Sequence, residues 1–88
     1  MTQVDFLDEP PECAMLTDYD RSHMKLYLRI LDATRDGADW REIADVLFGL
    51  NADEEPERAR RVINSHLARA RWMTTHGYRL LVREGQQH

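Results

Sequence analysis

Residues 37–72 read GADWREIADVLFGLNADEEPERARRVINSHLARARW, and their pattern predicts two consecutive helices joined by a turn. Asp39 can accept a hydrogen bond from the first turn of a helix, and Glu42 follows three residues later, which is the pattern of a capping box. Gly49 suits the left-handed position at the end of a helix. A short helix is therefore expected over about residues 40–48.

A longer, arginine-rich helix is expected to follow this short one. Pro56 suits the first turn of a helix, and the helix is expected to run to about His76, with Gly77 at its end. One apolar stripe is predicted along it by helical spacing: Ala59, Val62, Ile63, His66, Leu67, Ala70 and Met73. The turn between the two helices, residues 49–55, is seven residues long. A helix-turn-helix reader of DNA usually has a turn of about three or four residues.

A first helix is expected upstream of this pair, from Thr17 to about Arg35. Thr17 and Asp20 form a capping-box pattern, and Gly37 suits the end of the helix. The apolar residues on this helix spread over roughly 200°, twice the stripe that packing on one side requires. They are Tyr19, His23, Met24, Leu26, Tyr27, Leu28, Ile30 and Leu31. Either one small core wraps this helix, or a tail or partner covers part of it.

The sequence therefore predicts an all-α fold with three main helices and a short C-terminal element. Residues 1–16 contain Pro10, Pro11 and four acids, and they are expected to form an extended, flexible tail. Residues 17–83 form the predicted helix-turn-helix-like domain, and residues 84–88 a flexible end. The segment YRLLVREGQQH is compatible with a brief helix or a strand-like strip.

Composition and charge restrict the classes of function. The 88 residues permit one domain, and the formal net charge of −4 argues against a surface that binds nucleic acid all over. The charge is uneven, because residues 55–88 carry seven Arg and three Glu. The single Cys13 indicates a reducing cytoplasm. No apolar run is long enough to span a membrane, and the acidic N-terminus does not resemble a signal peptide.

Catalysis finds little support in the sequence. The histidines His23, His66, His76 and His88 show no zinc-binding spacing, and no phosphate loop or nucleophile elbow is present. His23 and His66 lie on apolar stripes, where hydrogen-bonded core histidines are expected. The sequence predicts a protein that is not an enzyme and has no cofactor or metal.

DNA recognition is the first functional candidate. The residues placed to meet base edges and phosphates are Arg58, Arg61, Asn64 and Ser65. Four acids at the turn and the helix start oppose this interpretation, because they would repel phosphates: Asp53, Glu54, Glu55 and Glu57. The alternative is a solvated face in which arginines pair with acids one turn away.

Trp72 points away from the apolar stripe of the long helix. It is expected either to be covered by the C-terminal strip or to be an exposed contact for a partner.

Three segments together resemble a known family. They are LTDYDRSHMKLYLRILDA, GADWREIADVLFG and EPERARRVINSHLARARWMTTHGYRLL, and they cover about residues 16–81. They resemble a domain-of-unknown-function family on proteobacterial integrative and conjugative elements, whose members are similar to helix-turn-helix domains with an extended turn. Some members are fused to an N-terminal companion domain and activate transfer genes. A short, acidic, stand-alone member is a quorum-sensing antiactivator, which this chain resembles in length and charge.

This resemblance implies a protein that binds a transcriptional activator, through its companion domain, and blocks transcription of transfer genes without touching nucleic acid. The residues expected to contact the activator are Tyr19, His23, Tyr27, Trp72 and Tyr78, and the chain is expected to be a monomer. The alternative is a sequence-specific DNA-binding protein that uses the arginine-rich helix. A structural dimerisation module is a third interpretation.

Overall fold

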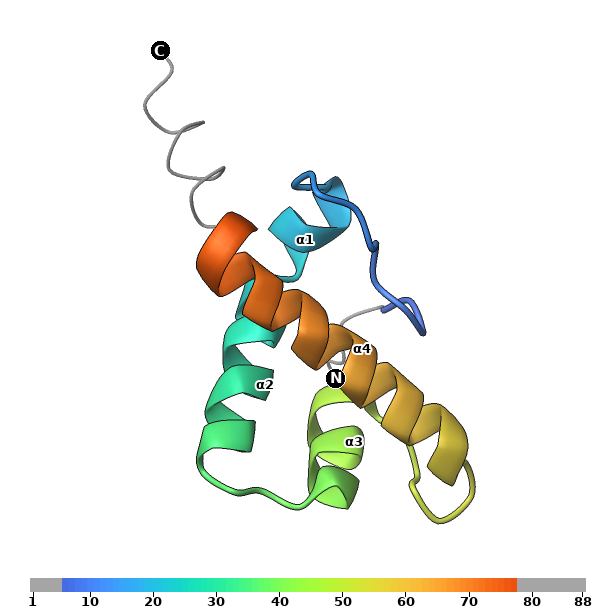
Figure 1. Ribbon diagram of the computed structural model, residues 1–88. Coiled ribbons are helices and arrows are strands. Elements are labelled where there is room, and N and C mark those ends of the chain that lie inside the picture. The colour runs from blue at the N-terminus through green and yellow to red at the C-terminus, as the bar shows by residue number, and fades with distance from the viewer. Residues whose placement is uncertain (1–5, 78–88) are drawn as a thin grey trace.

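A computed structural model describes residues 6–77, which fold into a bundle of helices (Figure 1). The elements are α1 (Asp18–Ser22), α2 (Met24–Arg35), α3 (Trp40–Phe48), α4 (Pro56–Trp72) and the π-helical turn η1 (Met73–Gly77). This part of the chain contains no strand, so the predicted all-α fold is confirmed. None of its helices is long and apolar enough to cross a membrane.

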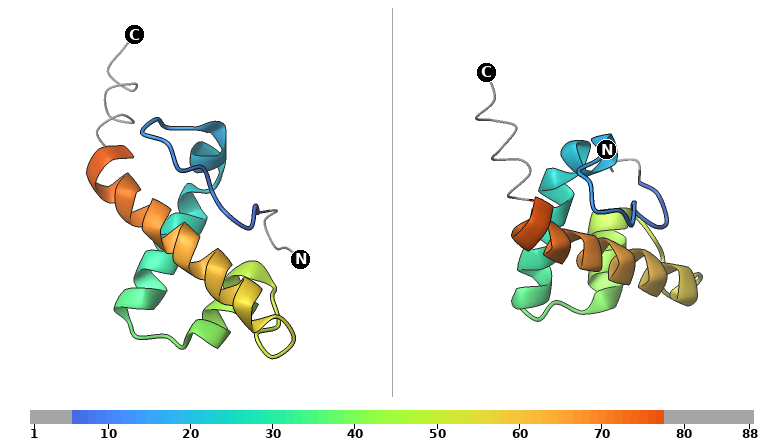
Figure 2. Two further views of the ribbon diagram at one scale, coloured as in Figure 1. Left: turned by 45° about the vertical axis from the view of Figure 1, so that its right-hand side comes forward. Right: turned by 45° about the horizontal axis from the view of Figure 1, so that its top comes forward.

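Helix α4 crosses both α2 and α3 and organises the core, as Figures 1 and 2 show from three directions. The core lies where the three helices meet. Its buried apolar members are Leu26, Tyr27, Ile30, Ile43, Ala44, Phe48, Leu50, Ala52, Ala59, Val62, Ile63, Ala70 and Met73. Because α2 and α3 cover only one side of α4, the remaining surface of α4 is free to meet other groups.

The predicted helix starts and ends are found at the expected residues, except that the capping box predicted at Asp39 and Glu42 is reduced to the single cap by Asp39. The Thr17 side chain accepts from the backbone N–H of Asp20, whose carboxylate accepts in return from the Thr17 N–H, so the first capping box is confirmed. Asp39 accepts from the N–H of Arg41 and caps α3. Gly49 ends α3 in the left-handed region, at φ 66°.

The first predicted helix is interrupted at His23, where the prediction of one continuous helix is wrong. His23 has φ −115° and ψ 22°, so the chain changes direction between α1 and α2. Its ring Nδ1 lies 2.8 Å from the carbonyl oxygen of Tyr19, to which it donates a hydrogen bond. The break explains part of the wide apolar arc, because the residues before and after His23 belong to two helices with different axes.

The long turn between α3 and α4 is held by its own residues. Leu50 and Ala52 are buried in the core, and the side chain of Asn51 accepts from the N–H groups of Asp53 and Glu54. The turn therefore has a fixed shape and presents its acids to solvent. At the other end, the regular α-helix stops at Trp72 and the wider η1 turn follows, earlier than the end predicted at His76.

Candidate nucleic-acid interface

Helix α4 has three faces. The first is buried against α2 and α3. The second carries Arg58, Ser65 and Trp72 and meets the N-terminal segment, residues 6–16. The third is open to solvent and carries three of the exposed side chains, Arg60, Asn64 and Arg71. By helical geometry, Asn64 and Arg71 point away from the buried stripe, and Arg61 lies at the border between the second and third faces.

The N-terminal segment runs alongside α4 and places an acid on the second face (Figure 2). The carboxylate of Asp8 accepts from Arg58 at two points, with Nη2–Oδ1 2.9 Å and Nε–Oδ2 3.0 Å. Arg61 Nη2 lies 3.6 Å from the same carboxylate, and Ser65 Oγ donates to the Asp8 carbonyl oxygen at 3.1 Å. Three of the four predicted DNA-contacting residues therefore meet Asp8, and only Asn64 lies outside this cluster.

This geometry also sets the protonation of the cluster. The hydrogen bonds from Arg58 hold the pKa of Asp8 below its usual value, against the smaller opposing effect of burial. Hydrogen bonds to Asp8 and Glu55 raise the pKa of Arg58. The pair is therefore fully charged at neutral pH.

The segment around Asp8 is anchored on both sides. The ring of Phe6 packs edge-on against Phe48, with centroids 5.1 Å apart, and the Leu7 N–H donates to the hydroxyl of Tyr19 at 3.1 Å. Pro10 is buried. The segment is extended, as expected, but residues 6–16 are packed on the domain rather than free of it.

A buried ion pair fixes the other end of the segment. Arg69 Nε donates to Asp20 Oδ1 at 2.9 Å, and the Tyr27 hydroxyl donates to the same oxygen at 2.8 Å. The remaining guanidinium nitrogens of Arg69 donate to the carbonyl oxygens of Cys13 and Met15, at 2.7 and 2.8 Å. Burial alone would raise the pKa of Asp20, but these bonds and those from Thr17 outweigh it and lower the pKa to about 2.

Sequence reasoning missed this ion pair. Arg69 borders the apolar stripe of α4. From the sequence, an arginine at such a position is predicted to be exposed to solvent unless its acidic partner is known. The one feature of the sequence that indicated a partner for Arg69 was Asp20, and Asp20 had already been assigned to the capping box of the first helix.

The two core histidines behave as predicted. His66 is completely buried, and its Nδ1 donates to the Val62 carbonyl at 2.8 Å while its Nε2 accepts from the Tyr19 hydroxyl at 2.6 Å. Burial lowers the pKa of His66, so the ring is neutral at pH 7. Within the described part of the chain, no group of three His, Cys, Asp or Glu residues is placed to hold a metal ion.

The residues predicted to contact an activator lie mostly inside the domain. Tyr27 is 2% exposed and His23 8% exposed, and the ring of Tyr19 stacks on that of His23 at 3.9 Å. These three side chains therefore position the core and the N-terminal segment. Tyr78 lies outside the described residues.

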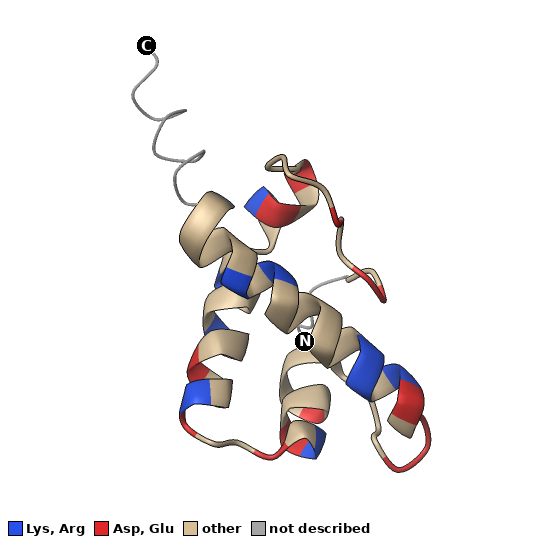
Figure 3. Cartoon of the chain, viewed as in Figure 1, with Lys and Arg blue, Asp and Glu red and all other residues tan. Residues whose placement is uncertain are grey.

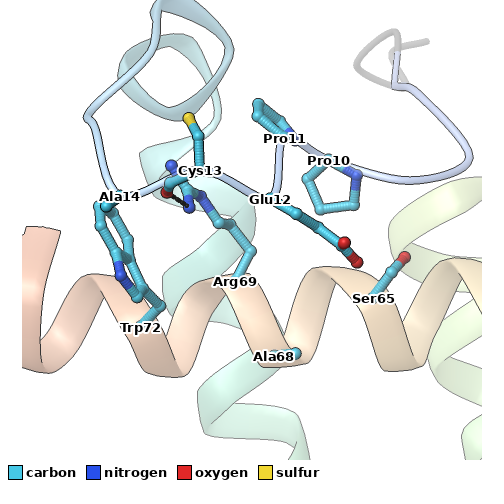
Figure 4. Close-up of a pocket in the computed structure, with 9 residues that line it drawn as sticks. All are labelled: Pro10, Pro11, Glu12, Cys13, Ala14, Ser65, Ala68, Arg69 and Trp72. Atoms are coloured by element: carbon cyan, nitrogen blue, oxygen red, sulfur yellow. Dashed lines mark hydrogen bonds between the residues drawn. The ribbon is translucent and has the colours of Figure 1, made fainter.

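Trp72 is half-buried, and the N-terminal segment covers it on one side. Figure 4 shows Trp72 and Arg69 reaching up from α4 toward Ala14 and Cys13. The guanidinium of Arg69 lies 3.9 Å from the ring centroid of Trp72, a cation–π contact. The cover expected from the C-terminal strip involves residues outside those described.

An apolar groove opens on the opposite side of α4, between α2 and η1. It has a volume of about 110 Å³ and is lined by Met24, Tyr27, Leu28, Leu31, Ala70, Met73 and Thr74. Leu28 is 58% exposed, so α2 does present apolar surface, although through a different residue from those predicted.

The charge on the surface is divided between the turn and the helix. Figure 3 shows acids along the turn that precedes α4 and basic residues along α4 itself. Arg60 lies over the ring of Trp40, 4.5 Å from its centroid, at the junction of α3 and α4. The basic character of the open face therefore extends from this junction along α4 to Arg71.

A helix-turn-helix-like pair with a basic outer helix is the architecture of a DNA-binding domain of a transcription factor. The family of DNA-binding domains named RovC, described as "T6SS, Transcription factor, DNA binding domain", matches residues 5–83, and the chain belongs to this family. No curated protein matches the chain. The membership favours the DNA-binding alternative over the antiactivator interpretation and makes nucleic acid the first partner to consider.

Proposed function

We propose that the chain is a transcription regulator that binds double-stranded DNA through the outer surface of α4. The observation that carries this proposal is the open face of α4, with Arg60, Asn64 and Arg71 exposed on one side of a helix whose opposite side is buried. The family membership supports it, because the matched residues include the whole of α4.

The side chains on this face suit the major groove. Arginine can donate two hydrogen bonds to guanine, and asparagine can pair with adenine. Arg60, near Trp40, suits a contact with a backbone phosphate, because such contacts fix the position of the helix on the duplex.

The acidic turn restricts how α4 can approach DNA. Asp53, Glu54 and Glu57 are exposed beside the N-terminal end of α4, and like charges brought together across an interface are costly. We therefore place the centre of the contact near Asn64 and Arg71, and the acidic turn at its edge.

Fluorescence anisotropy tests this proposal with duplexes selected from a random-sequence pool. The titrations are run at about 50 and 200 mM salt, because phosphate contacts weaken steeply over this range. Arg71→Ala should weaken binding and reduce the salt slope by about one. Arg29→Ala is the matched control, because it removes the same charge from an exposed position on α2. It should leave the affinity for DNA and the salt slope unchanged. Absence of binding by the wild type at the lower salt concentration would refute the proposal.

A second candidate function is that of an antiactivator, which binds a transcriptional activator of transfer genes and blocks it. Two observations favour it. The arginines Arg58 and Arg61 are paired with acids of the same chain, and the apolar groove exposes Leu28. A helix of the activator's companion domain is a suitable occupant, because amphipathic helices bind in apolar grooves.

A pull-down of the activator distinguishes this second candidate. Leu28→Asp should abolish capture of the activator. Val46→Asp is the matched control, because Val46 is also an aliphatic residue and is 65% exposed on α3, outside the groove; this variant should still capture the activator. Capture that is equal for the two variants would show that the groove is not the contact surface.

A further inference from the structure

The cluster around Asp8 has the chemistry of an anion-binding site. Arg58 donates two hydrogen bonds to one carboxylate, and Arg61 approaches the same carboxylate at 3.6 Å. Arginine binds carboxylate and phosphate in the same two-pronged geometry. We infer that Arg58 and Arg61 form a binding site for a phosphate of the DNA backbone, and that Asp8 occupies this site in the free protein. This inference rests on the proposed function.

The position of the cluster on α4 supports this assignment. Arg58 and Arg61 lie on the flank next to the open face that carries Asn64. A helix in the major groove has bases in front of its outer face and phosphates beside its flanks. A phosphate of bound DNA is thus expected beside the flank of α4 that carries Arg58. In the free protein the carboxylate of Asp8 lies at this position.

The anchoring of the segment determines how the exchange takes place. Phe6 and Pro10 fix the backbone on both sides of Asp8, and Arg69 holds Cys13 and Met15 further along. The segment therefore stays in place, and the side chain of Asp8 rotates away when a phosphate arrives. The longer contacts of Arg58 with Glu55, at 3.3 Å, and of Arg61 with Glu9, at 4.0 Å, leave the nitrogens that Asp8 occupies available to the phosphate.

The ion pair of Arg58 with Asp8 is expected to open more easily than the ion pair of Arg69 with Asp20, which agrees with a segment that stays in place while Asp8 moves. The side chains of Arg58 and Asp8 are 38% and 39% exposed, whereas those of Arg69 and Asp20 are 5% and 0% exposed. An exposed pair contributes little and is screened by salt, so it exchanges easily. The buried pair does not, because opening it would leave a charge unpaired in the interior.

The experiment compares two variants of the full chain that lose one negative charge from the same segment. Asp8→Asn removes the carboxylate that meets Arg58. Glu12→Gln removes an exposed carboxylate that forms no ion pair with the described residues. DNA binding is measured by anisotropy with the same selected duplexes over a series of salt concentrations.

Asp8→Asn should tighten binding by roughly fivefold at low salt, and it should steepen the salt slope by about one, because one more phosphate contact releases one more set of counterions. Glu12→Gln should change the affinity by less than about twofold and leave the slope unchanged. Adding Arg58→Ala to Asp8→Asn should cancel the gain.

Equal affinities and equal slopes for the two variants would overturn the inference and leave the proposed function standing. Absence of binding by the wild type and by Asp8→Asn would overturn both.

Discussion

Loss of Arg69 should destabilise the domain more than loss of any other single charge on α4. The residue is 6% exposed and shares hydrogen bonds with the completely buried Asp20. In Arg69→Met the stem of the side chain still packs, but the Asp20 carboxylate is left buried without its partner. Breaking a buried ion pair in this way typically costs about 3–5 kcal/mol.

The pKa of Asp20 reports the net stabilisation of its carboxylate by Arg69, Thr17 and Tyr27 together, after the cost of burial. Its folded value of about 2 lies below the ordinary value of 3.8, and that difference corresponds to about 2 kcal/mol of stability. Because the folded pKa is the lower one, this contribution is complete at pH values above about 4 and disappears as the pH falls toward 2.

Urea unfolding measures both quantities. The assay uses the wild type, Asp20→Asn, Arg69→Met and the double variant at pH 7, and the first two also at pH 5 and pH 2.5. The double variant should be less destabilised than the sum of the single variants, because the two residues act as a pair. The wild type should lose stability relative to Asp20→Asn on acidification. An Arg69→Met variant within about 1 kcal/mol of the wild type, or additive single variants, would refute this reasoning.

Three further outcomes are expected from stability measurements. Burial lowers the pKa of His66 below its usual 6.5, so the free energy of unfolding should fall as the pH drops below about 6.5. In urea titrations His66→Gln should reduce this pH dependence, and a pH profile equal to that of the wild type would contradict the prediction. Gly49→Ala should cost about 1 kcal/mol in urea unfolding, because the residue has φ 66° and alanine rarely adopts this backbone conformation; an unchanged free energy of unfolding would contradict it. Thr17→Ala should cost about 1 kcal/mol by removing the cap of α1, and Thr17→Ser should restore most of it; equal stabilities of these two variants would argue against the cap.

The helices were predictable from the sequence because their signals are local. Thr17 and Asp39 act within one turn of themselves, and Gly49 requires only the backbone conformation at its own position. The seven-residue turn and its exposed acids follow from the same local pattern. The break at His23 was not predictable, because the residues around it have an uninterrupted helical periodicity and the break depends on how α1 meets α4.

The arrangement of the site was predictable only in part. The sequence indicated which face of α4 carries arginines, but not that Asp8 lies on Arg58, because these residues are 50 positions apart. Likewise, the wide apolar arc predicted that Tyr27 lies on the surface. In the structure Tyr27 is buried, because its hydroxyl donates a hydrogen bond to Asp20. Contacts between distant parts of a chain depend on the tertiary fold, which periodicity does not contain.

The hydrogen bonds from Arg69 to the carbonyl groups of Cys13 and Met15 determine which residues the folding unit must include. A truncation at residue 17, where the capping box marks the start of the first helix, would remove both acceptors and leave two guanidinium donors facing solvent beside an uncovered Trp72. The smallest autonomous fragment therefore includes Cys13 and Met15. The segment that covers these donors also carries Asp8, so its removal would at the same time expose Arg58.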